Sequence, residues 1–275
     1  MVRQPALSVR RIPYWHVDAF SAAPFGGNQA AVMILDEWLP DETLVRIGAE
    51  NNFAETAFLV RDGTGEADWE LRWFTPTNEI RLCGHATLAS GHALLAHSPE
   101  YVEAPRVTFR TRQSGVLEVR RMDEGYEVAL PAIATDKSDF EEAAVCIGAA
   151  PREVWRSPLG YNLFLYDDEA TIRALDPDFR KLAYLGDHLF VCTAPGSETD
   201  VVSRVFVPAH GIDEDPVTGG AHAVLTPFWT ERLGRDSFSA YQASARGGYL
   251  TCRLDGDRVW LGGPCVTVVE GTFAL

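Results

Sequence analysis

The chain repeats one sequence pattern, and this repeat constrains the fold more than any other feature. The pentapeptide R-x-F-x-P occupies residues 72–76 and again residues 204–208, an offset of 132 positions. Four further pairs keep the same chain order at offsets of 132 to 135 positions: Asn28 with Asn162, 55–58 with 187–190, Gly84 with Gly219, and 115–131 with 248–264. Such matches indicate two copies of one structural unit. We predict two halves, residues 1–131 and 132–275, with the last strand able to return to the first half.

The order of strands and helices is readable within the first unit. Apolar runs bounded by turn residues predict strands at 14–20 and 30–35, on either side of a turn at 24–27. An amphipathic pattern predicts a helix from Pro40 to Ala49, followed by strands at 55–60 and 69–75. Strand-rich sequence between residues 107 and 130 completes the unit.

Each unit also contains one helix with almost no polar face. Residues Gly84 to Ala96 are rich in alanine, leucine and glycine and include no charged residue, so the helix is expected to be buried on nearly all sides. The second unit repeats this arrangement with a strand at 201–207, a loop, and a helix from Gly219 to Thr230. We predict an α+β (mixed α/β) fold with two pseudo-symmetric halves, each a sheet or barrel wrapped around one apolar helix. A cleft between such halves is the natural ligand site.

Composition excludes several classes of partner. The formal net charge is −15 and no basic cluster occurs, which argues against nucleic acid and against an anionic membrane. No signal peptide or membrane span is predicted, and the five scattered cysteines fit a reducing cytoplasm. Motifs for dinucleotides, nucleoside triphosphates and serine hydrolases are lacking, so we expect a site without a cofactor.

Glycines open both buried helices. Gly84 begins the first helix, and Gly219 and Gly220 begin the second. A helix start carries about four unpaired N–H groups and roughly half a positive charge, and glycine lets a ligand approach them closely. Two such starts aimed into one cleft would bind the carboxylate of a small anionic substrate. Alternatively, the glycines only permit tight packing or a turn.

Two carboxylates lie near these helix starts in the sequence. Glu55 stands inside the apolar stretch FAETAFLV, and Asp215 precedes Gly219 by four residues. A carboxyl among apolar groups has a raised pKa and can both accept and release a proton. Either residue could instead be a surface charge at a strand end or a helix cap.

The stretch RLCGHATLAS places Cys83 and His85 on either side of Gly84. Racemisation by two thiols would need a second cysteine in the other half, where threonine precedes Gly219. Cys83 is therefore expected to be a buried small residue. His85 and His92 lack further ligands at site-like spacing, and no metal is expected. His85 suits a neutral donor or proton shuttle, with an ordinary packed histidine as the alternative.

Longer segments resemble the PhzF-like family of phenazine-biosynthesis isomerases. They are VDAFSAAPFGGNQAAV (17–32), FAETAFLV (53–60), LRWFTPTNEIRLCGHATLAS (71–90) and DEDPVTGGAHAVL (213–225). The resemblance implies the diaminopimelate epimerase fold and a cofactor-free isomerisation, in which a glutamate moves a proton across a dihydro-hydroxyanthranilate ring. It also makes a homodimer plausible.

Matching positions imply the site residues. The catalytic residues fall on Glu55, His85 and Asp215, and the substrate-binding ones on the following positions: Asn28, Gly84, Gly219 and Gly220. The chain departs from the family pattern at Ala54 and Gly220, where serine is common, so the phenazine precursor is in doubt as the substrate. Two alternatives stay open: a non-catalytic binder of a small carboxylic acid or a protein partner, and an epimerase or racemase that uses two carboxylates.

Overall fold

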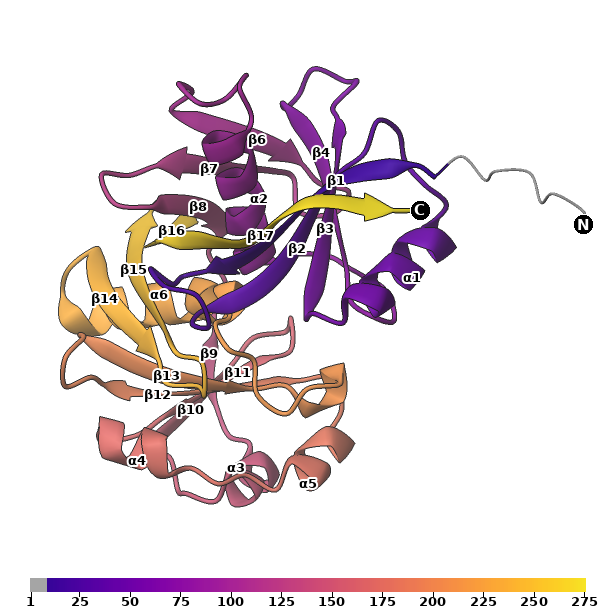
Figure 1. The fold of residues 1–275 in the computed structure, drawn as a ribbon. Helices are drawn as coiled ribbons and strands as arrows, with labels where there is room; N and C mark the ends of the chain where they lie inside the picture. The colour runs from indigo at the N-terminus through magenta and orange to yellow at the C-terminus, as the bar shows by residue number, and fades with distance from the viewer. Residues whose placement is uncertain (1–8) are drawn as a thin grey trace, which may run out of the picture.

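The computed structural model describes residues 9–275, which form two sheet-rich halves joined into one continuous sheet (Figure 1). The strands of the first half and the linker are as follows: β1 (Arg11–Ala19), β2 (Asn28–Ile34), β3 (Glu55–Arg61), β4 (Trp69–Phe74), β5 (Glu79–Ile80), β6 (Arg106–Arg110), β7 (Val116–Arg121), β8 (Tyr126–Pro131) and β9 (Asp136–Ser138). The remaining strands are as follows: β10 (Glu153–Arg156), β11 (Tyr161–Leu165), β12 (Leu189–Pro195), β13 (Val201–Phe206), β14 (Ser237–Gln242), β15 (Gly248–Asp255), β16 (Arg258–Gly263) and β17 (Cys265–Ala274).

Helices lie inside the sheets and on their outer surface. They are as follows: α1 (Asp41–Asn51), α2 (Gly84–His97), α3 (Glu141–Ile147), α4 (Glu169–Ala174), α5 (Phe179–Tyr184), the 3₁₀ helix η1 (Pro208–His210) and α6 (Gly219–Leu233). No helix among residues 9–275 is long and apolar enough to cross a membrane.

The two halves pair their strands in the same sequence of directions. In the first half, two of the neighbouring pairs are parallel, β2–β3 and β4–β6. The other four are antiparallel: β1–β2, β3–β4, β6–β7 and β7–β8. The neighbours from β10 to β16 repeat that order. The internal repeat of the sequence is therefore a repeat of structure, and the mixed α/β class predicted from it is confirmed.

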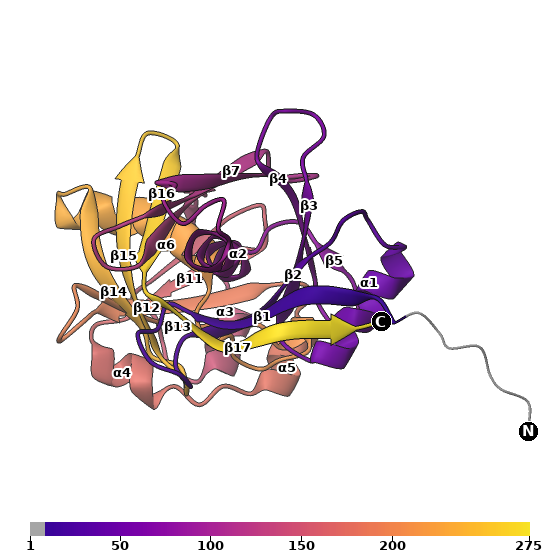
Figure 2. The ribbon, with the colours of Figure 1, turned by 45° about the horizontal axis from the view of Figure 1, so that its top comes forward.

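The two apolar helices occupy the interior of the two halves. Twelve of the 14 residues of α2 are buried, and strands β1, β2, β3, β6, β7 and β8 contact it from several sides. Figure 2 shows α2 nearly end-on with these strands around it. In the second half α6 contacts β11, β14, β15 and β16, and ten of its 15 residues are buried. An uncharged helix gains apolar contacts around its whole circumference in such a position, which explains why neither helix has a polar face.

The halves are connected by strand pairing at two places. Strand β8, which ends at Pro131, pairs antiparallel with β16 of the second half. The last strand, β17, runs antiparallel to β1 along almost its whole length, so the chain ends inside the first half. Helices α3, α4 and α5 cover the outer surface of the second half, at the bottom of Figure 1. A separate apolar cluster including Ile147, Phe164 and Phe190 lies beneath them.

Candidate functional site

The site is centred on the point where α2 and α6 begin. A Cβ atom on Gly84 would lie 2.9 Å from the Cα of Gly219, and one on Gly219 would lie 2.8 Å from the Cα of Gly84. Only glycine fits at either position. Neither N-cap residue, Cys83 or Thr218, makes a side-chain cap hydrogen bond. The free N–H groups and the positive dipole ends of both helices therefore lie next to each other.

Glu55 is the first residue of β3, and the parallel register with Ala30 of β2 holds its backbone beside these helix starts. Its side chain is 16% exposed, and Oε2 lies 3.2 Å from Nε2 of His85. Burial, and secondarily the negative charge of Asp215, raise the pKa of Glu55 to about 8, against a smaller opposing effect of a hydrogen bond with Cys83. The protonated form of this carboxyl is therefore favoured at pH 7.

His85, the second residue of α2, is a neutral histidine in contact with Asn28. Burial lowers its pKa to about 4. The Nδ2 of Asn28 donates to Asp215 Oδ1 at 2.8 Å and to the Val217 carbonyl at 2.9 Å, and it lies 3.2 Å from His85 Nδ1. Both amide hydrogens of Asn28 are used by Asp215 and the Val217 carbonyl, so this contact leaves the ring proton of the neutral His85 able to occupy either nitrogen.

Nε2 of His85 faces Glu55, yet the two side chains do not form a hydrogen bond with each other. His85 Nε2 and Glu55 Oε2 are 3.2 Å apart, but the alignment is too poor for a hydrogen bond, and both atoms are buried without a partner. Buried polar atoms without protein partners are rare, and they are often found where a ligand binds. These two atoms are therefore available to a third group.

Asp215 is a fixed carboxylate supplied by the second half. Its Oδ1 accepts from Asn28 and its Oδ2 accepts from the Thr218 hydroxyl at 2.6 Å. Burial raises the pKa of Asp215 to about 6, while these two hydrogen bonds oppose the rise. Asp215 thus ionises at a lower pH than Glu55, and its charge then favours retention of the Glu55 proton. Asn28 connects the acid of one half to the histidine of the other.

Gln242 supports this arrangement and carried no recognisable sequence signal. It is completely buried at the end of β14. Its Nε2 donates to the Asp215 carbonyl at 2.7 Å, and its Oε1 accepts from the Thr218 N–H at 2.8 Å. The buried side chain of Gln242 therefore fixes the turn from Asp215 to Thr218. Thr218 stands directly before the glycine pair, so its position was visible in the sequence, but its hydrogen bond to Asp215 was not.

Cys83 belongs to the site but is a poor base. It is 6% exposed, and burial raises the pKa of its thiol well above 9, so the thiol is protonated. Ligand atoms of Glu55, Cys83 and His85 lie within 4.8 Å of one another, close enough to bind a metal ion. Metal binding would need the carboxyl of Glu55 and the thiol of Cys83 in their ionised forms, which burial disfavours for both groups. His92, considered with His85 in the sequence, instead contacts Thr267.

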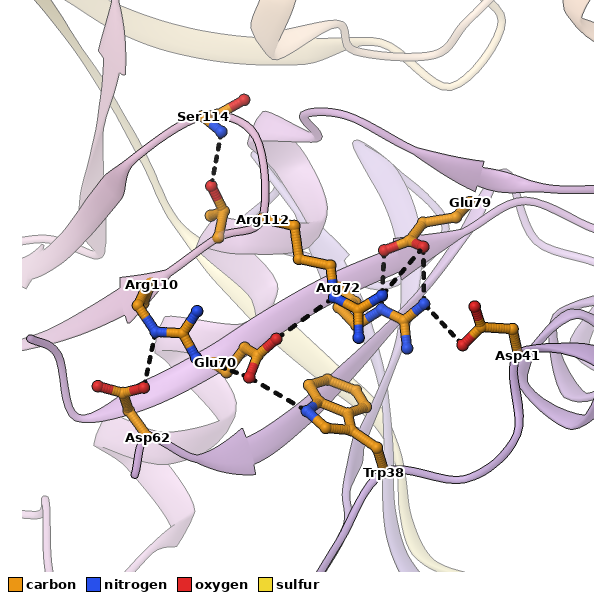
Figure 3. Close-up of polar contacts among 10 residues, drawn as sticks. Trp38, Asp41, Asp62, Glu70, Arg72, Glu79, Arg110, Arg112 and Ser114 are labelled. Carbon is orange, nitrogen blue, oxygen red and sulfur yellow. Dashed lines mark hydrogen bonds and ion pairs between the residues drawn. The ribbon is translucent and has the colours of Figure 1, made fainter. Parts of the chain in front are cut away.

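The two arginines of the R-x-F-x-P repeat hold the loops that lead into α2 and α6. Arg72 is 1% exposed and binds Glu79 through two hydrogen bonds of 2.8 and 2.7 Å. Figure 3 shows Arg72 between Glu79 and Asp41, which it also contacts at 2.9 Å. In the second half Arg204 binds Glu214 in the same bidentate way, at 2.8 and 2.9 Å. Planar bidentate pairs have a defined geometry, so each loop is held at an equivalent point.

The structure thus brings together the site residues that were predicted from the sequence. Glu55, His85, Asp215 and Asn28 form one connected group beside Gly84 and Gly219. Gly220 lies on the second-half side of this point. A Cβ atom there would be 2.3 Å from the hydroxyl of Tyr161, a residue that the sequence did not single out.

Sequence comparison identifies relatives along almost the whole chain. Residues 17–271 match the family model PhzC-PhzF, described as phenazine biosynthesis-like protein. A Pseudomonas aeruginosa protein named uncharacterized isomerase PA3578 is 45% identical over 266 residues, which cover 96% of this chain and 99% of that protein. A Halalkalibacterium halodurans protein named uncharacterized isomerase BH0283 is 39% identical and covers 96% of this chain and 98% of its own.

Solved structures agree with this assignment. The crystal structure of a phenazine biosynthesis protein of the PhzF family from Enterococcus faecalis is 39% identical, with a TM-score of 0.89 over 97% of this chain and all of that one. A hydroxyproline epimerase from Agrobacterium vitis shares the fold at 13% identity and a TM-score of 0.57 over 97% of this chain and 93% of its own. The chain therefore belongs to the PhzC-PhzF family of phenazine biosynthesis-like proteins and is an isomerase.

Proposed function

We propose that the chain moves a proton within a small carboxylate-bearing substrate, unsaturated or cyclic, without a cofactor, and that Glu55 carries this proton. The observation that supports this most directly is the state of Glu55. Its carboxyl is buried with a pKa of about 8, and Oε2 is unpartnered beside the paired helix starts. A general acid/base works best when its pKa lies near the working pH, because both protonation states are then accessible.

The reaction divides between binding and proton transfer. The substrate carboxylate binds the free N–H groups at Gly84, Gly219 and Gly220, which orients the reacting carbon toward Glu55. The ionised form of Glu55 removes a proton from that carbon, the double bond shifts, and the same carboxyl returns the proton to another carbon of the substrate. His85 donates its Nε2 proton as a hydrogen bond to the developing negative charge. Asp215, whose oxygens both accept hydrogen bonds, maintains the high pKa of Glu55.

The phenazine precursor itself is a doubtful substrate. The family's usual serine at the position before the glutamate is Ala54 here, and the usual serine of the second helix start is Gly220. Each missing hydroxyl removes one hydrogen bond, worth about 0.5–1.5 kcal/mol. We propose the same type of proton shift on a related carboxylate.

Solvent deuterium provides the test. A dihydro-hydroxyanthranilate and related unsaturated ring carboxylates are incubated with the protein in D₂O, and deuterium incorporation is followed by NMR. We expect incorporation with the wild type and a loss of about 10²- to 10⁴-fold in Glu55→Gln, the contribution typical of a general acid/base. Binding should persist in the variant, because the glycine N–H groups are unchanged. Equal rates in the two proteins would refute the role of Glu55.

An epimerase or racemase that uses two carboxylates is the second candidate. The charge of Asp215 raises the pKa of Glu55 further after burial, which supports a site that the two carboxyls share. An epimerase would invert a stereocentre of its substrate, whereas the proposed isomerase would move a double bond, and optical rotation distinguishes the products. Tight binding without any deuterium exchange would instead favour the non-catalytic binder.

A further inference from the structure

The second position of each buried helix differs between the halves. In α2 this position is His85, whose ring lies against Glu55. In α6 the equivalent position, at an offset of 135, is Gly220. A Cβ atom on Gly220 would lie 2.3 Å from the Tyr161 Oη and 3.1 Å from its Cζ. The hydroxyl of Tyr161 therefore takes the space that a side chain at position 220 would fill.

The Tyr161 hydroxyl is an unused donor at this point. Tyr161 begins β11, directly after Gly160, whose φ of +86° lets the chain turn into the strand. Its Oη makes no hydrogen bond with any residue between 9 and 275. Burial raises the pKa of the phenol, with Arg81 opposing the rise, so the hydroxyl keeps its proton. Tyr161 is partly buried, whereas across the helix starts His85 Nε2 and Glu55 Oε2 are buried without partners.

We propose that Tyr161 determines substrate specificity by binding a second polar group, a hydroxyl, amino or keto group, on the carbon frame of the substrate carboxylate. This inference rests on the proposed function, which places the carboxylate at Gly84 and Gly219. With the carboxylate there, Glu55 and His85 meet the substrate from the first half and Tyr161 meets it from the second. A substrate without that group leaves the phenol hydroxyl unpaired, and sites built around a hydrogen bond discriminate against such analogues.

Binding of simple ring acids tests the proposal without turnover. Benzoate and its 2-, 3- and 4-hydroxy isomers are titrated into the wild type and into Tyr161→Phe by calorimetry. We expect one hydroxylated isomer to bind the wild type about three- to tenfold more tightly than benzoate, as one neutral hydrogen bond allows. Tyr161→Phe should erase this preference and leave benzoate affinity within about twofold. A preference that survives in Tyr161→Phe, or a wild type that binds no isomer more tightly than benzoate, overturns the proposal.

Two further variants separate specificity from folding. Tyr241→Phe is the matched control, because the Tyr241 hydroxyl also lies close to a glycine, 2.4 Å from a Cβ built on Gly247, but packs against the outer cluster of the second half. It should retain the preference. Gly220→Ala should displace the Tyr161 hydroxyl and reduce the preference as Tyr161→Phe does, with circular dichroism confirming the fold.

The inference and the proposed function can fail separately. If the protein shows a hydroxyl preference that depends on Tyr161 but exchanges no deuterium, the specificity role stands and the isomerase mechanism is refuted. If deuterium exchange depends on Glu55 but the hydroxyl preference is the same in wild type and Tyr161→Phe, the isomerase mechanism stands and the specificity role is refuted.

Discussion

Replacing Glu55 by glutamine should make the protein more stable, and increasingly so as the pH rises. The folded carboxyl has a pKa of about 8, compared with 4.5 for a glutamate side chain exposed to water. Between these values the folded state retains a proton that the unfolded state has released. The wild type therefore loses stability as the pH rises through this window. Glutamine resembles the protonated carboxyl in shape and never ionises, so it avoids this loss.

The size of the effect follows from the shift in pKa. Because a tenfold change in proton affinity is worth 1.36 kcal/mol, a pKa of about 8 in place of 4.5 corresponds to a free energy of unfolding lower by on the order of 5 kcal/mol. The advantage of Glu55→Gln over the wild type should be constant below about pH 4.5, grow by about 1.4 kcal/mol per pH unit, and level off above about pH 8.

Urea denaturation followed by tryptophan fluorescence, at pH values from 5 to 9, measures this difference. Each variant is compared with the wild type at the same pH, so titrations elsewhere in the chain cancel. Glu50→Gln makes the same chemical change at an exposed position on α1. Its difference in unfolding free energy from the wild type should show no comparable increase with pH. A difference between Glu55→Gln and the wild type that stays flat from pH 5 to 9 would refute the claim that burial perturbs Glu55.

Three other substitutions test the remaining parts of the site. Asp215→Asn removes the negative charge near Glu55, so the pKa of Glu55 should fall, by about one unit for charges several ångströms apart. In ¹³C NMR the labelled carboxyl of Glu55 should then titrate at a lower pH than in the wild type. Cys83→Ala should keep deuterium exchange within about tenfold of the wild type, because burial keeps the thiol protonated; loss comparable to that of a general base would show that the thiol takes the proton. Gly84→Ala should separate the two helix starts, since its Cβ would lie 2.9 Å from the Cα of Gly219. The free energy of unfolding should fall by about 1–3 kcal/mol, and calorimetry should show weaker carboxylate binding. Unchanged stability and binding would show that the contact can relax.

Much of the fold could be predicted because its signals are local or repeated. The predicted helix at 40–49 is α1, and the helices predicted from Gly84 and Gly219 are α2 and α6. The strands predicted at 55–60 and 69–75 are β3 and β4, each within one residue at its ends. Short helices with little periodicity were not predicted, among them α3, α4 and α5, whose six or seven residues are held by packing on the outer surface of the sheet.

Glycine at the two helix starts marks a close approach between the helices themselves. Gly84 and Gly219 contact each other directly, which confirms tight packing, whereas access of a ligand to their N–H groups stays a prediction. Their roles in binding a substrate stay predictions, as do those of Glu55, His85 and Asp215 in catalysis. The division of the chain at residue 131 and the homodimer also stay predictions.

The sequence by itself determined the two-fold repeat, the two apolar helices, the family and the candidate site residues, because these depend on residue type, spacing and order along the chain. Only the tertiary structure decided how those residues are charged and connected. Asn28 meets Asp215 across 187 positions, and Tyr161 fills the space at Gly220. The pKa of Glu55 depends on the sum of all the groups that exclude water from it, and these come from segments far apart in the chain. Desolvation of this kind leaves no local pattern, so it exists only after the two halves have folded against each other.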